Sequence, residues 1–390
     1  MKTKNTIHFT QEQVTKILEQ IAQEKDGYNK VLTISLEALM RAEREIFNRA
    51  KDDVSNGYRW RKTFGMQKQL TLQVPRSRRH RFYPVLLAVL KDQEQEIREV
   101  AFKLYGDGLT TDQVGEIFNL IYGKQYSPSQ ISRLFEYARE DIKQWLERPL
   151  QPYYPIIYID ATYILTRRGE SVSKEAYFTI LGVLPDRTRE VLAIVNFPTE
   201  SATAWGEVAE QLKSRGVKRI DLVVSDALIG IEESMASVFS NISHQFCIFH
   251  LKKNVLSHIK PKEKPAIIEE LNEVILVDTP NDTIEQAWQR WVKFIDKHSV
   301  KYPSLKKMKN ERYRHYFTYV KYDYRIRSMI YTTNWIERLN RDYKRTTRMR
   351  GALPNPDATI LLLGYVAMNK KAYKRKVPKL NYDKSFQWED

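Results

Sequence analysis

The sequence predicts an α/β protein whose central sheet combines an antiparallel meander with parallel strands and is followed by a helical segment. Three apolar stretches are joined by short connections, which favours antiparallel pairing. Two further apolar stretches each follow a helical pattern, at 201–215 and 231–239, so these strands are expected to be parallel. From 251 to 330 the pattern is mostly helical. The five apolar stretches are 156–160, 177–184, 190–197, 220–225 and 244–249.

The composition limits the class of protein and of partner. The chain has 390 residues, and 64 Lys and Arg against 48 Asp and Glu give a formal charge of +16. This excess points to nucleic acid or to an anionic membrane surface as the partner. A hydrophobic fraction of 42% and an aromatic fraction of 12% exclude an intrinsically disordered chain.

The cysteine count and the apolar runs bear on location. A single cysteine, Cys247, excludes an intrachain disulfide and favours a reducing compartment. No apolar run approaches the ~20 residues that cross a bilayer, and the polar start shows no secretory signal. We therefore expect a cytoplasmic protein with no membrane partner.

The N-terminal part combines helices with a strongly basic segment. Residues 8–50 show helical periodicity and predict two helices. Between Arg59 and Arg81 the sequence has eight Lys and Arg and no acid, and 69–75 alternates as a short strand would. Such clustering favours contacts with phosphate groups, and the alternative is a solvated basic surface. The candidate contacts are Arg59, Arg61, Lys62, Arg76, Arg78, Arg79 and Arg81.

Residues 99–147 are predicted to be helical and contain a candidate helix-turn-helix. A serine–proline pair at 127–128 is typical of a helix start. In a helix-turn-helix, the first residues of the second helix reach base edges in the major groove. The alternative is an ordinary helical hairpin. The candidate base-contacting residues are Ser129, Gln130, Ser132 and Arg133.

Two carboxylates close apolar strands of the predicted sheet, Asp160 after 156–159 and Asp226 after 220–225. The two strands are expected to be parallel neighbours, so both carboxylates should lie at one edge, where ligands of open α/β sheets bind. Paired carboxylates select Mg²⁺, with Mn²⁺ as a substitute. A third carboxylate on a helix over this edge would complete a site for two ions and phosphoryl transfer.

Glu337 is the candidate third carboxylate. It lies on a predicted helix that begins near Trp335, after the capping sequence 332–334. Four basic residues follow on or near one face of this helix, which suits phosphate binding beside a metal site. The alternative is a solvated helix face. The four residues are Arg341, Lys344, Arg345 and Arg348.

Two further clusters have alternative interpretations. Cys247 and His250 form half of a zinc site, which His244 and His258 could extend, or they order the sheet edge without metal. The stretch 313–331 interleaves tyrosine with arginine and lysine. Such residues can stack on unpaired bases, or the tyrosines can belong to the core.

These motifs together resemble those of the Mutator-type DDE transposases, which many bacterial insertion sequences encode. The resemblance covers nearly the whole chain, and the combination of motifs is specific. The matching stretches are Asn56-Gly57-Tyr58 with Val74-Pro75-Arg76; Tyr158-Ile159-Asp160-Ala161-Thr162-Tyr163 with Gly169; Glu200-Ser201-Ala202 with Trp205; Arg215-Gly216-Val217 with Val224-Ser225-Asp226; His244-Gln245-Phe246-Cys247 with His250 and Asn254; and Thr332-Thr333-Asn334 with Glu337-Arg338-Leu339-Asn340-Arg341.

The resemblance implies a ribonuclease-H-like catalytic core that a helical insertion interrupts. It implies that Asp160, Asp226 and Glu337 are catalytic and bind two Mg²⁺ ions. The implied partners are double-stranded DNA, as inverted-repeat ends and as target, and a second copy of the chain, because two ends must be brought together. The implied location is the nucleoid. Supporting roles fall to Cys247, His250, Asn334 and Trp335.

Two residues depart from the family pattern: Ala227 replaces a usual glycine, and Trp335 replaces a usually small residue. Both changes bear on the level of activity. Two other functions stay open: a catalytically silent DNA-binding regulator, and a nuclease on the same core.

The expected organisation has seven segments. They are an N-terminal helical region at 1–55, a basic DNA-binding segment at 56–98, a helix-turn-helix domain at 99–150, the first part of the catalytic core at 151–255, a helical insertion at 256–330, the second part of the core with the Glu337 helix at 331–370, and a basic tail at 371–390.

Overall fold

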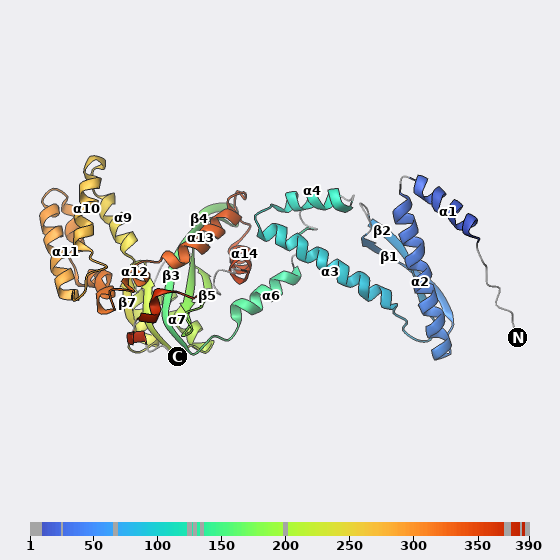
Figure 1. Ribbon diagram of the computed structural model, residues 1–390, viewed down its shortest axis with the longest axis horizontal. Helices are drawn as coiled ribbons and strands as arrows, with labels where there is room; N and C mark the ends of the chain where they lie inside the picture. The colour runs from blue at the N-terminus through green and yellow to red at the C-terminus, as the bar shows by residue number, and fades with distance from the viewer. Residues whose placement is uncertain are drawn as a thin grey trace. The chain divides into compact units, whose positions relative to one another are not determined.

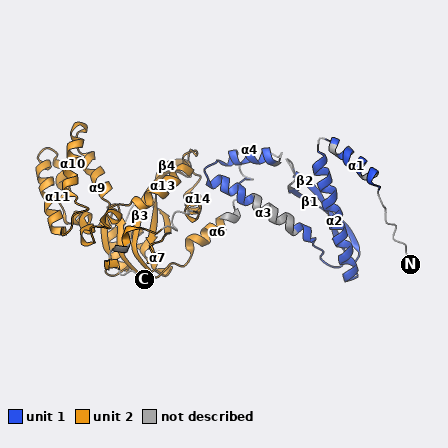
Figure 2. Ribbon diagram, viewed as in Figure 1, with its two compact units in different colours: residues 1–138 blue, residues 139–390 orange. Residues whose placement is uncertain are grey.

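The computed structural model describes most of the chain (Figure 1). It divides into two units, residues 1–138 and residues 139–390 (Figure 2). No helix in the parts described is both long and apolar enough to span a membrane. The described residues are 10–24, 26–64, 69–122, 127, 131–132, 136–197, 202–369, 376–382 and 384–386.

The first unit begins with the two predicted helices, which are confirmed as α1 (Gln11–Gln23) and α2 (Gly27–Lys51). An antiparallel pair of strands follows, β1 (Ser55–Phe64) and β2 (Gln69–Ser77). The sequence predicted β2 but not β1, because β1 shows no alternation of apolar and polar residues. Its middle, Tyr58 to Lys62, is basic and aromatic and mostly exposed.

The core of the first unit lies between β2 and the helices. Leu70, Leu72 and Val74 alternate along β2 and pack with Met40 of α2 and with Leu87. Leu87 belongs to α3 (Val85–Gly106), which continues through residue 98. The expected basic segment and the expected helix-turn-helix region therefore share one helix.

Helix α4 (Thr111–Tyr122) is the first helix of the predicted helix-turn-helix. Its start is fixed by a reciprocal cap. The Thr110 backbone N–H donates to Gln113 Oε1 at 2.9 Å, and the Gln113 N–H donates to Thr110 Oγ1 at 3.2 Å. The candidate base-contacting residues Ser129, Gln130 and Arg133 lie outside the described residues. The helix-turn-helix stays a prediction.

The second unit contains the predicted mixed sheet, in the strand order β5-β4-β3-β6-β7. The pairs β3–β4 and β4–β5 are antiparallel, and β3–β6 and β6–β7 are parallel, as expected. The first two strands are longer than predicted because both continue into a hairpin that turns at Gly169. The strands are β3 (Tyr153–Arg168), β4 (Ser171–Val183), β5 (Arg189–Asn196), β6 (Arg219–Ser225) and β7 (Ser243–Phe246).

Helices surround this sheet. Before it comes α6 (Glu136–Glu147), and between strands lie α7 (Ala202–Ser214) and α8 (Ile231–Val238). Trp205 of α7 is fully buried and meets Phe178 of β4 edge to face. Gly216 ends α7 with a φ of 114°, where its N–H donates to Lys213 O at 3.0 Å, which confirms the predicted C-cap.

The segment after β7 is helical, as predicted. The apolar stripe of α11, Trp288 to Ile295, is buried. In Figure 1 helices α9, α10 and α11 gather at the end of the second unit that carries β7. The elements are α9 (Ile248–Ser257), η1 (Pro261–Glu263), α10 (Lys264–Val274), α11 (Ile284–Ser299), η2 (Pro303–Met308), η3 (Glu311–Lys321) and α12 (Arg327–Ile330).

The remaining elements return to the sheet. Helix α13 (Asn334–Thr347) packs on β3, and α14 (Pro356–Met368) packs on β5 and β3. Two short 3₁₀ turns, η5 (Lys379–Tyr382) and η6 (Lys384–Phe386), lie near the C-terminus. One boundary was wrong: the strand predicted at 244–249 ends at Phe246, because α9 begins at Ile248.

Candidate active site

Asp160 and Asp226 lie where the parallel pairing of β3 with β6 stops. The last pair joins Ile159 of β3 to Ser225 of β6; Asp160 is the next residue within β3, and Asp226 follows the end of β6. The sequence predicted this placement from two apolar runs that each end in a carboxylate. The structure confirms that the two aspartates are neighbours across β3 and β6. The prediction that Asp160 closes its strand was wrong, because β3 continues to Arg168 in the hairpin with β4.

The environment of Asp160 disfavours its charged form. Burial is the main cause and raises the pKa of Asp160 from 3.8 to about 6. The negative charge of Asp226 raises the pKa further, while His250, the Ala161 N–H and Lys344 lower it. A half-buried carboxylate beside a second carboxylate is costly to ionise unless a cation compensates both charges.

Helix α13 is tied to this edge by Asn340. Its side-chain Nδ2 donates a hydrogen bond to Asp160 Oδ2 at 2.7 Å, and the residue is only 5% exposed. The Asn340 Oδ1 atom is buried without a hydrogen-bond partner among the described residues. Asn340 belongs to the motif that begins at Glu337, but the sequence predicted no role for it. Its spacing of three residues after Glu337 was the available signal.

Glu337 lies on α13 one turn before Asn340 and is exposed. This places the predicted third carboxylate on the helix that contacts Asp160. Within the described part of the chain, no three His, Cys, Asp or Glu side chains are grouped closely enough to hold one metal ion. The structure thus brings together Asp160 and Asp226, and it places Glu337 on the adjoining helix.

The loop after Asp226 is held by an arginine from the helical segment. Arg312 of η3 donates from Nη2 to the Leu228 carbonyl at 2.5 Å and from Nη1 to the Ala227 carbonyl at 3.4 Å. The same guanidinium forms an ion pair with Glu232 of α8. The guanidinium of Arg312 is therefore engaged within the protein.

A cavity of about 510 Å³ adjoins Asp226. Helix α9 contributes Lys253, Asn254 and Ser257 to its lining, and η3 contributes Tyr313. The cavity therefore lies between the sheet edge and the helical segment, and it is open to the carboxylate of Asp226.

The comparison with known proteins decides the family. The family model described as "Transposase, Mutator family" matches residues 2–376. The chain belongs to the Mutator family of transposases. It is 30% identical over 287 residues to the transposase for insertion sequence element IS905 of Lactococcus lactis subsp. lactis, which covers 74% of this chain and 72% of the relative.

Another relative covers almost all of this Mutator-family chain. The transposase for insertion sequence element IS256 in transposon Tn4001 of Staphylococcus aureus is 28% identical over 376 residues, which is 93% of the chain and 95% of the relative. The transposase for insertion sequence element IS1201 of Lactobacillus helveticus is 26% identical over 317 residues, 80% of the chain and 84% of the relative. The expected family is confirmed.

Cys247 and His250 of the transposase lie beside the carboxylates. Buried Cys247 places its Sγ 3.5 Å from Thr333 Oγ1, next to α13. His250 Nδ1 is 3.9 Å from Asp226 Oδ1. A hydrogen bond with Cys247 is the main cause that raises the pKa of His250 to about 9; the two aspartates add to it and burial opposes it. The charged form of the His250 imidazole is therefore favoured beside the carboxylates.

His244 is not arranged with this pair. It is buried beside His315, with ring centroids 6.2 Å apart, and burial lowers the pKa of His244 to about 4. This arrangement favours the ordering role of Cys247 and His250 at the sheet edge over a zinc site that includes His244.

The basic residues of α13 occupy its exposed side. Arg341, Lys344, Arg345 and Arg348 are exposed, while Ile336, Leu339 and Tyr343 are buried. The predicted start of the helix is correct within one residue, although Thr333 at the N-cap makes no side-chain cap.

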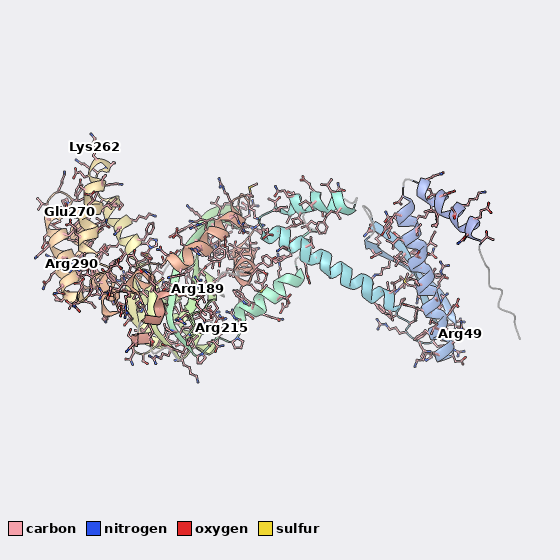
Figure 3. The ribbon with its side chains drawn as sticks, viewed as in Figure 1. Arg49, Arg189, Arg215, Lys262, Glu270 and Arg290 are labelled. Carbon is pink, nitrogen blue, oxygen red and sulfur yellow. The ribbon has the colours of Figure 1, made fainter. Side chains whose placement is uncertain are left out.

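Trp335 is engaged within the protein. Its Nε1 donates to the Met329 carbonyl at 3.1 Å, and the Arg189 guanidinium lies 4.7 Å from its ring centroid (Arg189 is labelled in Figure 3). Asn334, the first residue of α13, is exposed. Ala227 does not have a positive φ, so the turn after Asp226 does not require glycine.

Three of the six tyrosines in 313–331 belong to the core. Tyr316, Tyr319 and Tyr322 are buried, and Tyr322 stacks on Phe386 at 4.9 Å between ring centroids. Arg327 is buried and donates to backbone carbonyls, including that of Tyr322 at 2.9 Å. The core interpretation holds for these residues.

The basic residues predicted to contact phosphates lie on or after the β1–β2 pair. Arg61 is half-buried, and the other six are exposed. Lys370 and the five residues after it lie outside the described residues.

Proposed function

We propose that this chain binds the inverted-repeat ends of an insertion sequence and catalyses Mg²⁺-dependent strand cleavage and strand transfer of DNA. The observation that carries the proposal is the placement of Asp160 and Asp226 next to each other where the parallel pairing of β3 with β6 stops, with α13 bonded to Asp160. Membership of a transposase family supports a phosphodiester as the substrate of this pair of carboxylates.

Asp160, Asp226 and Glu337 are the residues that would hold two Mg²⁺ ions, with Mn²⁺ as a substitute. The donor set fits, because carboxylate oxygens are the ligands that these hard cations prefer. The raised pKa of Asp160 and the unpartnered Oδ1 of Asn340 also fit a site that a cation would complete. When bound, such ions activate the attacking oxygen and stabilise the leaving oxygen of a phosphoryl displacement.

Other residues of the chain would position the substrate. Asn340 holds the Asp160 carboxylate in one orientation, and Arg312 holds the loop that follows Asp226. The exposed Arg341, Lys344 and Arg345 on α13 are suited to DNA phosphates near the carboxylates. We further propose that two copies of the chain act together, since both ends of the element must meet.

A strand-transfer assay tests the proposal. The full chain is incubated with Mg²⁺, a target plasmid and a duplex that carries the inverted repeats flanking its gene. Asp160→Asn, Asp226→Asn and Glu337→Gln should each lower cleavage and transfer about 1000-fold or more, since a metal site supplies several kcal/mol to the reaction. Duplex binding should persist in all three variants.

The control is Glu207→Gln, which removes a charge from the exposed side of α7 and should leave activity unchanged. Cleavage without transfer by the wild-type chain would favour the nuclease alternative. Binding without any cleavage would favour the silent regulator.

A further inference from the structure

Strand β1 carries large aromatic side chains on an exposed face. Of its side chains, Trp60 is 69% exposed and Tyr58 is 43% exposed, although both are large and aromatic. The partner strand β2 instead buries Leu70, Leu72 and Val74 against the helices. Core packing therefore accounts for β2 but does not account for the aromatic residues of β1.

The register of the two strands separates the side chains of β1 by face. Trp60 is paired with Gln73 and Lys62 with Thr71, so these four share one face. Arg59 is paired with Val74, which lies on the face that packs toward α2. The indole of Trp60 and the ammonium of Lys62 thus lie together on the open face of the sheet.

The pair of strands is held firmly by α2. Glu37 Oε1 accepts a hydrogen bond from the Gln73 backbone N–H at 2.8 Å. Arg44 donates from Nη1 to the Gly57 carbonyl at 3.3 Å, and its guanidinium lies 5.2 Å from the centroid of the Tyr58 ring. The open face is therefore presented in one orientation, which lowers the entropy cost of binding a partner.

The charge around this face selects an anionic partner. From residue 54 to residue 91 the sequence contains no acid. The two acids just before this stretch are engaged by it: Asp53 accepts the backbone N–H groups of Arg79 and His80, and Asp52 lies 3.7 Å from the Arg79 guanidinium. The major groove of B-form DNA has the width to admit a two-stranded β-ribbon.

We propose that the β1–β2 pair enters a groove of duplex DNA with its open face, which carries Trp60 and Lys62, toward the bases. The proposal rests on the proposed function, because it assigns part of the DNA-binding surface of the transposase. It adds a surface that the helix-turn-helix prediction does not include.

The test measures binding of the full chain in EDTA, so that no cleavage contributes. The probe is a duplex that carries the sequence flanking the gene. Trp60→Ala should weaken binding about tenfold or more, the effect of losing one large buried apolar contact. Its matched control is Tyr28→Ala, which removes an aromatic ring that is 65% exposed on α2 and should leave the affinity unchanged.

A second readout follows Trp60 directly. Acrylamide quenching of the wild-type chain is compared with that of Trp60→Phe, and the difference reports the accessibility of Trp60. A saturating concentration of duplex should reduce the acrylamide quenching that is attributed to Trp60. Unchanged affinity of Trp60→Ala, or a Trp60 signal that stays accessible on saturating duplex, overturns the proposal.

Two other outcomes are equally informative. Protection of Trp60 that rises with protein concentration in the absence of DNA would assign this face to self-association and overturn the proposal. If the wild-type chain itself fails to bind the duplex, the proposed function fails together with this inference. If the wild type binds the duplex and Trp60→Ala binds it with the same affinity, the role of the β1–β2 pair is refuted and the proposed function is not.

Discussion

Asn340 donates a hydrogen bond from Nδ2 to Oδ2 of Asp160 at 2.7 Å, and this contact joins α13 to the edge of the sheet. Because Glu337 precedes Asn340 by one helical turn, the contact fixes where the third proposed carboxylate can lie. The buried amide thus links two residues of the proposed metal site that are far apart in the sequence.

Replacing Asn340 tests this link. Asn340→Ala removes the hydrogen-bond donor that orients Asp160. Loss of a group that orients a metal ligand typically lowers metal affinity or activity about 10–100-fold. We expect a higher Mg²⁺ concentration for half-maximal cleavage, with duplex binding retained. Asn272→Ala, which removes an exposed amide on α10, is the control. An unchanged Mg²⁺ requirement would show that Asn340 contributes to packing and does not orient Asp160 for metal binding.

Arg312 provides a separate test of how the helical segment supports the sheet edge. Arg312→Ala frees the carbonyls of Ala227 and Leu228 and leaves Glu232 without its cation. Hydrogen bonds to charged groups contribute about 1.5–3 kcal/mol each. We therefore expect cleavage to fall about tenfold or more, with partial recovery in Arg312→Lys.

The control for Arg312 is Arg314→Ala on the same turn, which breaks an ion pair with Glu285. Its cleavage rate should stay near that of the wild type. If both variants lose activity equally, the effect comes from general destabilisation of η3, and the role of Arg312 in holding the Asp226 loop is refuted.

Asp53 should make the first unit sensitive to acid. Burial acts to raise the pKa of Asp53, but hydrogen bonds from the backbone N–H groups of Arg79, His80 and Val54 outweigh it and hold the pKa well below 3.8. A depressed pKa stabilises the folded state above the unfolded pKa of Asp, and this contribution disappears as the pH falls toward the folded pKa.

The measurement compares Asp53→Asn with the wild type by hydrogen exchange at Arg79 and His80. At pH 7 the variant should lose protection at these two amides. Below about pH 4 the difference should shrink, because the pH then falls from the unfolded toward the folded pKa of Asp53 and the stabilisation by its charged carboxylate is lost. Asp52→Asn, at an exposed neighbour, is the control. A difference that stays constant with pH would contradict the assignment.

Lys344 on α13 tests whether the basic side of this helix contacts DNA. Lys344→Ala should weaken binding to all duplexes alike and lower the salt dependence of the binding constant by about one phosphate contact. Lys262→Ala, on η1 of the helical segment, is the charge-matched control (labelled in Figure 3). An unchanged salt dependence would place the DNA away from α13.

The sequence was sufficient to predict the strand pairing of the sheet and the neighbouring positions of Asp160 and Asp226. Buried runs that end in Asp160 and Asp226, together with helical crossovers, predicted the parallel pair β3–β6 and its edge. The strand β1 was missed, because its aromatic residues are exposed and leave no apolar alternation. The strand predicted through residue 249 was too long, because a short apolar run does not distinguish a strand from the helix that starts at Ile248.

The contacts around the carboxylates could not be predicted in the same way. Asn340 and Asp160 are 180 residues apart, and Arg312 and Leu228 are 84 residues apart. No local pattern encodes such contacts, since they depend on how the helical segment and α13 pack on the sheet. The sequence therefore predicted no role at the sheet edge for Arg312 or Asn340.

A change of metal preference tests the central proposal most directly. Asp226→Cys replaces a hard oxygen ligand with a softer sulfur, which binds Mg²⁺ poorly and accepts Mn²⁺ more readily. For a chain that still binds its duplex, we expect cleavage to be lost with Mg²⁺ and to return in part with Mn²⁺. Full cleavage with Mg²⁺, or none with either ion, would contradict the assignment of Asp226 as a metal ligand.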